Sequence, residues 1–102
     1  MKIILHPMKG HSPKNRFLEE WIADFLAGKD LSNRVKEGVS LPAIPTISQG
    51  ARVEIVYGIS HGKSGAVLVE IEGDPNYQWL SFHLEFTTFK ADTIGNVILT
   101  KG

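Results

Sequence analysis

The sequence predicts a single-domain α+β protein over residues 1–102, with an N-terminal helix packed on a four-stranded antiparallel β-meander. Apolar residues recur at helical spacing in the first third of the chain, and they alternate with polar residues through its second half. The chain has 102 residues, 42% of them apolar and 22% charged, and these values suit one hydrophobic core. No internal repeat or change of composition indicates a second domain.

The predicted helix begins after Ser12 and ends near Gly28. Ser12 is a preferred N-cap residue, and Pro13 suits the first helical position because its missing N–H has no helical partner there. Gly28 is a plausible C-cap residue. The apolar stripe consists of Phe17, Leu18, Trp21, Ile22, Phe25 and Leu26, and the acidic residues expected outside it are Glu19, Glu20 and Asp24.

The segments on either side of this helix carry weaker signals. Lys2–His6 has an apolar centre and precedes Pro7, so it fits a short strand. Asp30–Gly38 has cap-like residues and a final glycine but few apolar residues, which leaves a two-turn helix and an irregular segment both open. Val39–Gly50 is punctuated by proline and glycine between apolar residues, and this pattern predicts an ordered crossover to the sheet.

The second half of the chain predicts four antiparallel strands joined by turns. The expected core faces are Val53, Ile55, Tyr57 and Ile59 on the first strand, Val67, Val69 and Ile71 on the second, and Leu80, Phe82, Leu84 and Phe86 on the third. Turns are expected at Ser60–Ser64, Gly73–Asn76 and Asp92–Asn96. The last turn leads into Val97–Leu99 as the fourth strand. The expected register pairs Tyr57 with Val67, and Val69 with Leu80.

The charge and the cysteine content limit which binding partners and which cellular compartment the sequence predicts. Lys plus Arg and Asp plus Glu both number 11, without a block of like charge, which argues against nucleic-acid or membrane binding through bulk electrostatics. Cysteine is absent, so neither disulfides nor thiolate chemistry is available. The apolar run Ile3–Leu5 is too short for a signal peptide, and no stretch approaches the ~20 apolar residues of a membrane span. These features predict a cytoplasmic protein.

The segment Gly58–Ser64 ends in Gly-Lys-Ser, as a phosphate-binding loop does. Such a loop needs four residues between its glycines, whereas three separate Gly58 from Gly62, and it must lead from a strand into a helix. Both flanks here alternate like strands, so a hairpin turn is predicted and no cofactor is expected. The histidines also lack the short regular spacing of metal ligands, so no metal site is expected.

Three histidines and a lysine have the residue types of metal-free RNA cleavage. In that chemistry one imidazole takes the proton of the 2′-hydroxyl, a second protonates the leaving oxygen, and a lysine stabilises charge on the phosphorane. The candidate catalytic residues are His11, His61, Lys63 and His83. The same histidines are also compatible with an ordinary solvated surface.

Alternation gathers acidic residues and one tryptophan on the sheet face opposite the predicted core. The register places Glu54 opposite Glu70, a like-charge pair that favours a nearby cation, and it places Trp79 beside Glu70. An aromatic residue ringed by carboxylates has the composition of a binding site for a basic protein, although it also suits a solvated face. The candidate partner-binding residues are Glu54, Glu70, Glu72, Trp79, His83 and Glu85.

Two functional hypotheses follow from these residues. The first is a small non-catalytic protein-binding module, such as an immunity protein or antitoxin that neutralises a basic toxin partner, for example a nuclease. It expects no direct nucleic-acid contact. The alternative is a small metal-free ribonuclease or toxin. The absence of a recognised catalytic motif favours the first hypothesis.

Overall fold

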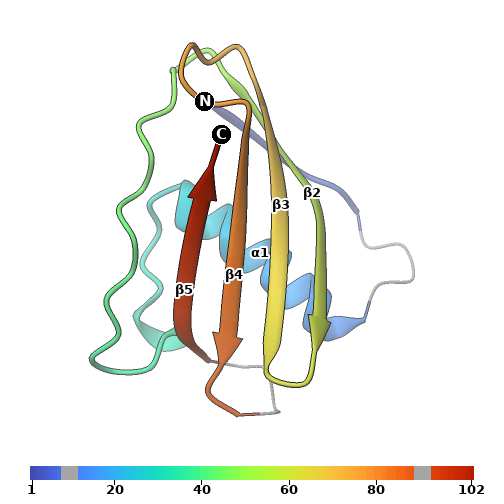
Figure 1. Cartoon of the computed structure of the whole chain (residues 1–102), viewed down its shortest axis with the longest axis vertical. Helices are drawn as coiled ribbons and strands as arrows, with labels where there is room; N and C mark the ends of the chain where they lie inside the picture. Colours follow the sequence, from blue (N-terminus) through green and yellow to red (C-terminus); the bar gives the residue numbers. More distant parts are fainter. Residues whose placement is uncertain (8–11, 89–92) are drawn as a thin grey trace.

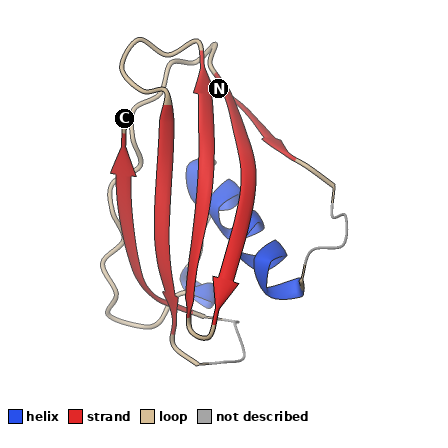
Figure 2. Cartoon of the chain, turned by 45° about the vertical axis from the view of Figure 1, so that its right-hand side comes forward, coloured by secondary structure: helices blue, strands red, loops and turns tan. Residues whose placement is uncertain are grey.

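The computed structural model describes residues 1–7, 12–88 and 93–102. One helix, α1 (Pro13–Leu26), lies behind a five-stranded sheet in the view of Figure 1, and Figure 2 shows it against one face only. The sheet order is β1-β2-β3-β4-β5, and these strands are β1 (Lys2–Leu5), β2 (Arg52–His61), β3 (Ser64–Glu72), β4 (Trp79–Phe86) and β5 (Ile94–Lys101). The predicted α+β class and the antiparallel meander of β2 to β5 are confirmed.

The predicted short strand at the N-terminus also forms, and it adds a fifth strand to the expected four. β1 pairs with β2 in parallel, with Ile3 opposite Val53 and Leu5 opposite Ile55. A parallel neighbour requires a long connection, and here α1 and the crossover lie between the two strands. The sheet is therefore mixed, with β1 and β5 at its edges.

Helix α1 begins and ends where the sequence predicts. The Ser12 side chain accepts a hydrogen bond from the Asn15 amide at 3.1 Å, and Gly28 follows the helix with a φ of +74°. The predicted position of Glu19 outside the apolar stripe is wrong. Its side chain is buried, because the helix turns that carboxylate towards β2 rather than into solvent.

The sequence left a two-turn helix and an irregular segment both possible over Asp30–Gly38. The structure has a single 3₁₀ turn there, at Ser32–Arg34. The Asp30 carboxylate accepts the Ser32 amide at 2.9 Å, and the Lys36 amide then donates to the Ile94 carbonyl at 2.9 Å. The backbone after the turn thus pairs with the start of β5 instead of continuing a helix. Residues 39–50 cross to the sheet without helix or strand, as predicted.

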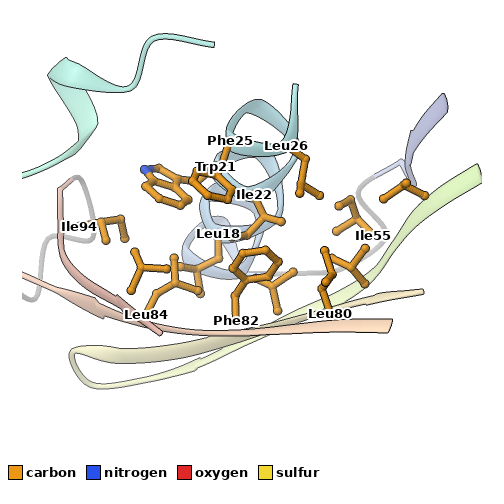
Figure 3. Close-up of a cluster of buried hydrophobic side chains, with 14 of the residues drawn as sticks. Leu18, Trp21, Ile22, Phe25, Leu26, Ile55, Leu80, Phe82, Leu84 and Ile94 are labelled. Atoms are coloured by element: carbon orange, nitrogen blue, oxygen red, sulfur yellow. The ribbon is translucent and has the colours of Figure 1, made fainter. Parts of the chain in front are cut away.

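The core lies between the stripe of α1 and the inner face of the sheet (Figure 3). Leu18, Trp21 and Ile22 are fully buried, and Phe25 meets Phe82 edge-on with 5.8 Å between ring centroids. The predicted core faces of β3 and β4 are confirmed, since all their members are buried. The pairing of Val69 with Leu80 is also as predicted.

The predicted face of β2 is wrong beyond Ile55. The register passes from Ile55 opposite Val69 to Tyr57 opposite Leu68, so Val56 is an extra residue in a β-bulge. Tyr57 therefore pairs with Leu68 and not with Val67. The bulge turns Tyr57 and its neighbour Ile59 outward, where they are 42% and 54% exposed.

Gly58 explains why β2 changes face. After the bulge it occupies the inward position, where a Cβ would lie 3.0 Å from both the Asn15 carbonyl oxygen and Glu19 Cγ. Contacts this close leave little room for a side chain larger than hydrogen. The strand accordingly places glycine beneath α1 and the bulky Tyr57 and Ile59 on the opposite face.

The turns agree with the prediction except near β5. Gly62 and Lys63 link β2 to β3, with Gly62 at a φ of +59°, so the segment resembling a phosphate-binding loop is a hairpin turn. β5 begins at Ile94, earlier than the predicted Val97, because a second register shift allows Ile94 to pair with Phe86. Asp92 of the predicted turn lies outside the described residues.

Asp74 connects the end of the crossover to the turn between β3 and β4. Its carboxylate accepts the Ser48 amide at 2.7 Å and the amides of Asn76 and Tyr77 at 2.8 and 2.9 Å. These bonds, that from Ser48 foremost, lower the pKa of Asp74 from 3.8 to about 2. The ionised carboxylate is therefore favoured in the folded state.

This pKa predicts a pH-dependent contribution to stability. Because the folded pKa of Asp74 is depressed, its contribution is present above a pH of about 4 and is lost as the pH falls through about 2. Asp74→Asn should remove that part of the acid sensitivity. Urea unfolding of both proteins between about pH 2 and 6 should show their free-energy difference shrinking at low pH. A difference independent of pH would contradict the assignment.

Candidate protein-binding face

One face of the sheet is covered by α1 and the other by no element of the described chain (Figures 1 and 2). We call the second one the outer face. It is formed by the outward side chains of the strands, the alternate residues that do not enter the core. All the sequence-predicted partner-binding residues lie on it: Glu54, Glu70, Glu72, Trp79, His83 and Glu85.

The acidic part of the outer face has the predicted register. Glu54 lies opposite Glu70, and Trp79 lies on the other side of Glu70. Glu54 of this like-charge pair has two side-chain partners, His6 Nε2 at 2.8 Å and the guanidinium Nη1 of Arg52 at 3.5 Å. The sequence reasoning missed His6, because it follows β1 and the parallel pairing of that strand was not foreseen.

The charge on the middle strands is of one sign. The outward positions of β3 and β4 carry Glu70, Glu72 and Glu85, and they carry no lysine or arginine. None of these three carboxylates forms an ion pair with a side chain in the described ranges. Lys2 and Arg52, the cations of the outer face, lie on β1 and β2. The middle of the face is thus uncompensated negative charge.

Trp79 is held in place by Gly102. Its amide and carbonyl exchange hydrogen bonds with those of Gly102 at 3.0 and 3.1 Å. The indole lies over Gly102, where a Cβ would come within 2.5 Å of the ring. Trp79 remains 38% exposed and lines a hollow of about 680 Å³ together with Glu70 and Glu72.

An apolar belt adjoins the acidic part, and sequence reasoning missed it. It consists of Tyr57, Ile59, Ala66 and Leu68 on β2 and β3, together with Ile98 of β5, which lies beyond His83 in the same row. Ile98 is 53% exposed and Ile59 is 54% exposed. The two residues lie at opposite ends of one row of neighbours across β2, β3, β4 and β5. The available signal was the isolated glycine at position 58, since a single glycine inside an alternating strand often marks a bulge.

The structure brings together two of the four candidate catalytic residues. His61 and His83 line one hollow of about 370 Å³ on the outer face, together with Ser64. The register separates them by two strands and two residues, roughly 12 Å between Cα atoms. Lys63 lies in the adjacent turn, and His11 is outside the described residues.

Within residues 1–7, 12–88 and 93–102, no group of three histidine, cysteine, aspartate or glutamate side chains is arranged to hold a metal ion. No helix in those ranges is long and apolar enough to cross a membrane. Comparison with protein-family models, curated proteins and solved structures found no match to this chain. The residues of the outer face are therefore the basis for assigning a function.

Proposed function

We propose that this chain is a non-catalytic protein-binding module whose outer face docks on a basic protein. The observation that carries the proposal is the composition of one uncovered sheet face. It combines the apolar belt, the exposed Trp79 and three glutamates that form no ion pair within the described part of the chain. An immunity protein or antitoxin that neutralises a basic toxin is the kind of protein this face would suit.

Each part of the face has a physical role in such binding. Apolar side chains that are about half exposed, such as Ile59 and Ile98, gain free energy when a partner removes them from water. A large aromatic residue such as Trp79 is a frequent energetic centre of protein interfaces. Surrounding carboxylates accelerate association with a cationic partner and select against an acidic one.

RNA cleavage by His61 and His83 is the second candidate, because both imidazoles line the same hollow. The charge of the face argues against it. Glu85 lies opposite Ser64 in that region, Lys63 is in the adjacent turn and not on a strand, and the outward positions of β3 and β4 supply no lysine or arginine. Phosphate groups would meet repulsion where a nuclease needs cations.

The proposal is tested by affinity capture with the tagged chain and three variants. Wild type should capture a basic protein in stoichiometric amount, less of it at ~0.5 M salt because screening weakens exposed charge pairs. Trp79→Ala and Glu70→Lys should weaken binding at least about 30-fold, as expected for an interface centre. The matched control is Glu37→Lys, which makes the same charge change at an exposed site outside the strands.

The outcomes separate the two candidates. Capture that survives both outer-face substitutions, or no captured protein at all, would refute the proposed role of this face. The same preparation is incubated with RNA in EDTA. Cleavage that is lost in His83→Ala would replace the proposal with the nuclease.

A further inference from the structure

The outer face is not flat, because small side chains lie between large ones. Along β3 the outward residues Ser64 and Ala66 have short side chains, and Ser81 of β4 lies opposite Leu68. Longer side chains flank this line: Ile59 on β2 and His83 on β4 lie beside Ala66, and Trp79 on β4 lies farther along, beside Glu70. We call the line formed by Ser64, Ala66, Leu68 and Ser81 the outer groove.

The two hollows already described are successive parts of this groove. The first lies over Ser64 and Ala66, and the second lies over Leu68 and Ser81 beside Trp79. The hollows share no lining residue, but Ala66 of the first and Leu68 of the second are consecutive outward residues of β3. The nine residues of β3 span roughly 30 Å, which matches an α-helix of about 20 residues.

From this geometry we propose that the outer groove receives a basic amphipathic α-helix of the partner protein. This inference rests on the proposed function and names the element that binds. The apolar side of the helix would cover Ala66 and Leu68, and lysine or arginine side chains would meet Glu70 and Glu72 beside the Trp79 ring. A cation over an indole face is itself an attractive contact.

Backbone hydrogen bonding distinguishes a helix from an extended segment on this face. The outward residues of β3 are flanked by β2 and β4, so the ladder groups of that strand bond within the sheet. An extended peptide laid on Ala66 and Leu68 would bury its own N–H and C=O groups without partners, whereas a helix satisfies them internally. α1 packs on the inner face in the same way.

Charge distinguishes a basic partner from a second copy of this chain. Two outer faces pressed together would oppose the unpaired glutamates of their middle strands, Glu70, Glu72 and Glu85, without lysine or arginine on those strands. Like charges in a partly desolvated interface are repulsive. A cationic helix instead neutralises them, so it is the occupant favoured by charge.

The inference is tested with two display libraries of 18-residue peptides with the same composition of leucine, lysine, arginine and alanine. One places leucine at helical spacing, and the other alternates leucine with cationic residues. Both are selected on the immobilised chain and on two groove-filling variants, Ala66→Arg and Ser81→Arg. Asn33→Arg is the control, because it adds the same side chain to an exposed position outside the sheet. Circular dichroism shows which variants remain folded.

The expected result is enrichment of helical-spacing peptides on wild type and Asn33→Arg, with binding at least about tenfold weaker on whichever groove variants are folded. Selected peptides should shift the amide resonances of β3 and β4. Enrichment of the alternating library, or no enrichment, overturns the helix inference. If the helix inference fails but the chain still captures a basic protein in a manner that depends on Trp79, the proposed function stands. If that capture is also absent, both the helix inference and the proposed function are refuted.

Discussion

Phe82→Ala is expected to lower the free energy of unfolding by about 3–5 kcal/mol, the largest effect of any single truncation considered for this fold. Phe82 is fully buried on the central part of β4, where it meets Phe25 of α1 edge-on. Alanine would remove the aromatic contact and leave a cavity between the helix and the sheet. A domain of this size is stable by only about 5–15 kcal/mol, so the variant would be close to unfolding.

Ile98→Ala is the matched control for this prediction. It also removes an apolar side chain from the meander, but Ile98 is 53% exposed on the outer face, so its loss should cost less than about 1 kcal/mol. Urea unfolding followed by circular dichroism measures both values. Equal losses from the two variants would mean that the core does not lie where the structure places it.

The register between β3 and β4 is unbroken, and both strands were predicted correctly. β3 and β4 are joined by a short turn and each buries one face, so alternation alone fixes both their register and the position of Trp79 beside Glu70. The same locality made the acidic part of the outer face predictable. Period-two patterns are informative here because a shift of one residue would expose the whole core face.

The features that were missed depend on contacts between distant segments. The bulge in β2 follows from the close approach of α1 to Gly58, and alternation within β2 contains no information about that helix. The apolar belt was missed for this reason, since Tyr57 and Ile59 were assigned to the core. The parallel pairing of β1 likewise joins segments separated by the helix and the crossover, and it supplies the His6 contact to Glu54.

These errors changed the interpretation of the outer face. Without the bulge, Tyr57 and Ile59 belong to the core face, and the outer face has fewer exposed apolar residues beside its acidic patch and tryptophan. With the bulge, exposed apolar residues lie beside that patch, and burial of such a combination by a partner is favourable. The packing of α1 against Gly58 therefore contributes to making the site recognisable.

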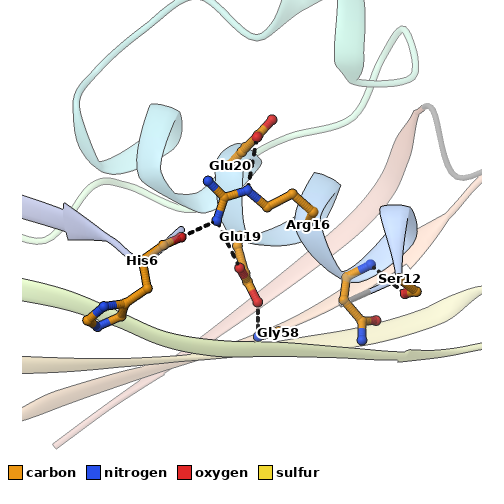
Figure 4. A network of polar contacts seen from close by, with 7 residues as sticks. His6, Ser12, Arg16, Glu19, Glu20 and Gly58 are labelled. Atoms are coloured by element: carbon orange, nitrogen blue, oxygen red, sulfur yellow. Dashed lines mark hydrogen bonds and ion pairs between the residues drawn. The ribbon is translucent and has the colours of Figure 1, made fainter. Parts of the chain in front are cut away.

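Glu19→Ala is expected to destabilise the protein by about 2–3 kcal/mol because it would leave a buried amide unpaired. The Glu19 side chain is 5% exposed, and its carboxylate accepts the Gly58 amide at 2.9 Å (Figure 4). Arg16 is its second partner, at 3.4 Å. Glu19→Gln should retain most of the stability, since the amide oxygen can still accept from Gly58.

The neighbouring Glu20 provides the control for Glu19. It also pairs with Arg16, at 3.1 Å, but its side chain is 53% exposed, so Glu20→Ala should change stability by no more than about 0.5 kcal/mol. Urea unfolding gives the three free energies, and amide hydrogen exchange reports on Gly58 directly. Slow exchange at Gly58 in Glu19→Ala would contradict the assigned hydrogen bond.

The contact between Glu19 and Gly58 lies at the edge of β2, beyond the residues that pair with β1. β1 pairs only with Arg52–Ile55, and beyond that point α1 lies against β2 through Glu19 and through Asn15, which bonds to Ser60. Unpaired strand edges promote association between chains, and a covering helix prevents it. Glu19→Ala should therefore self-associate more with rising concentration than Glu19→Gln in sedimentation experiments. If the two variants sediment alike, the carboxylate stabilises the helix contact without protecting the edge.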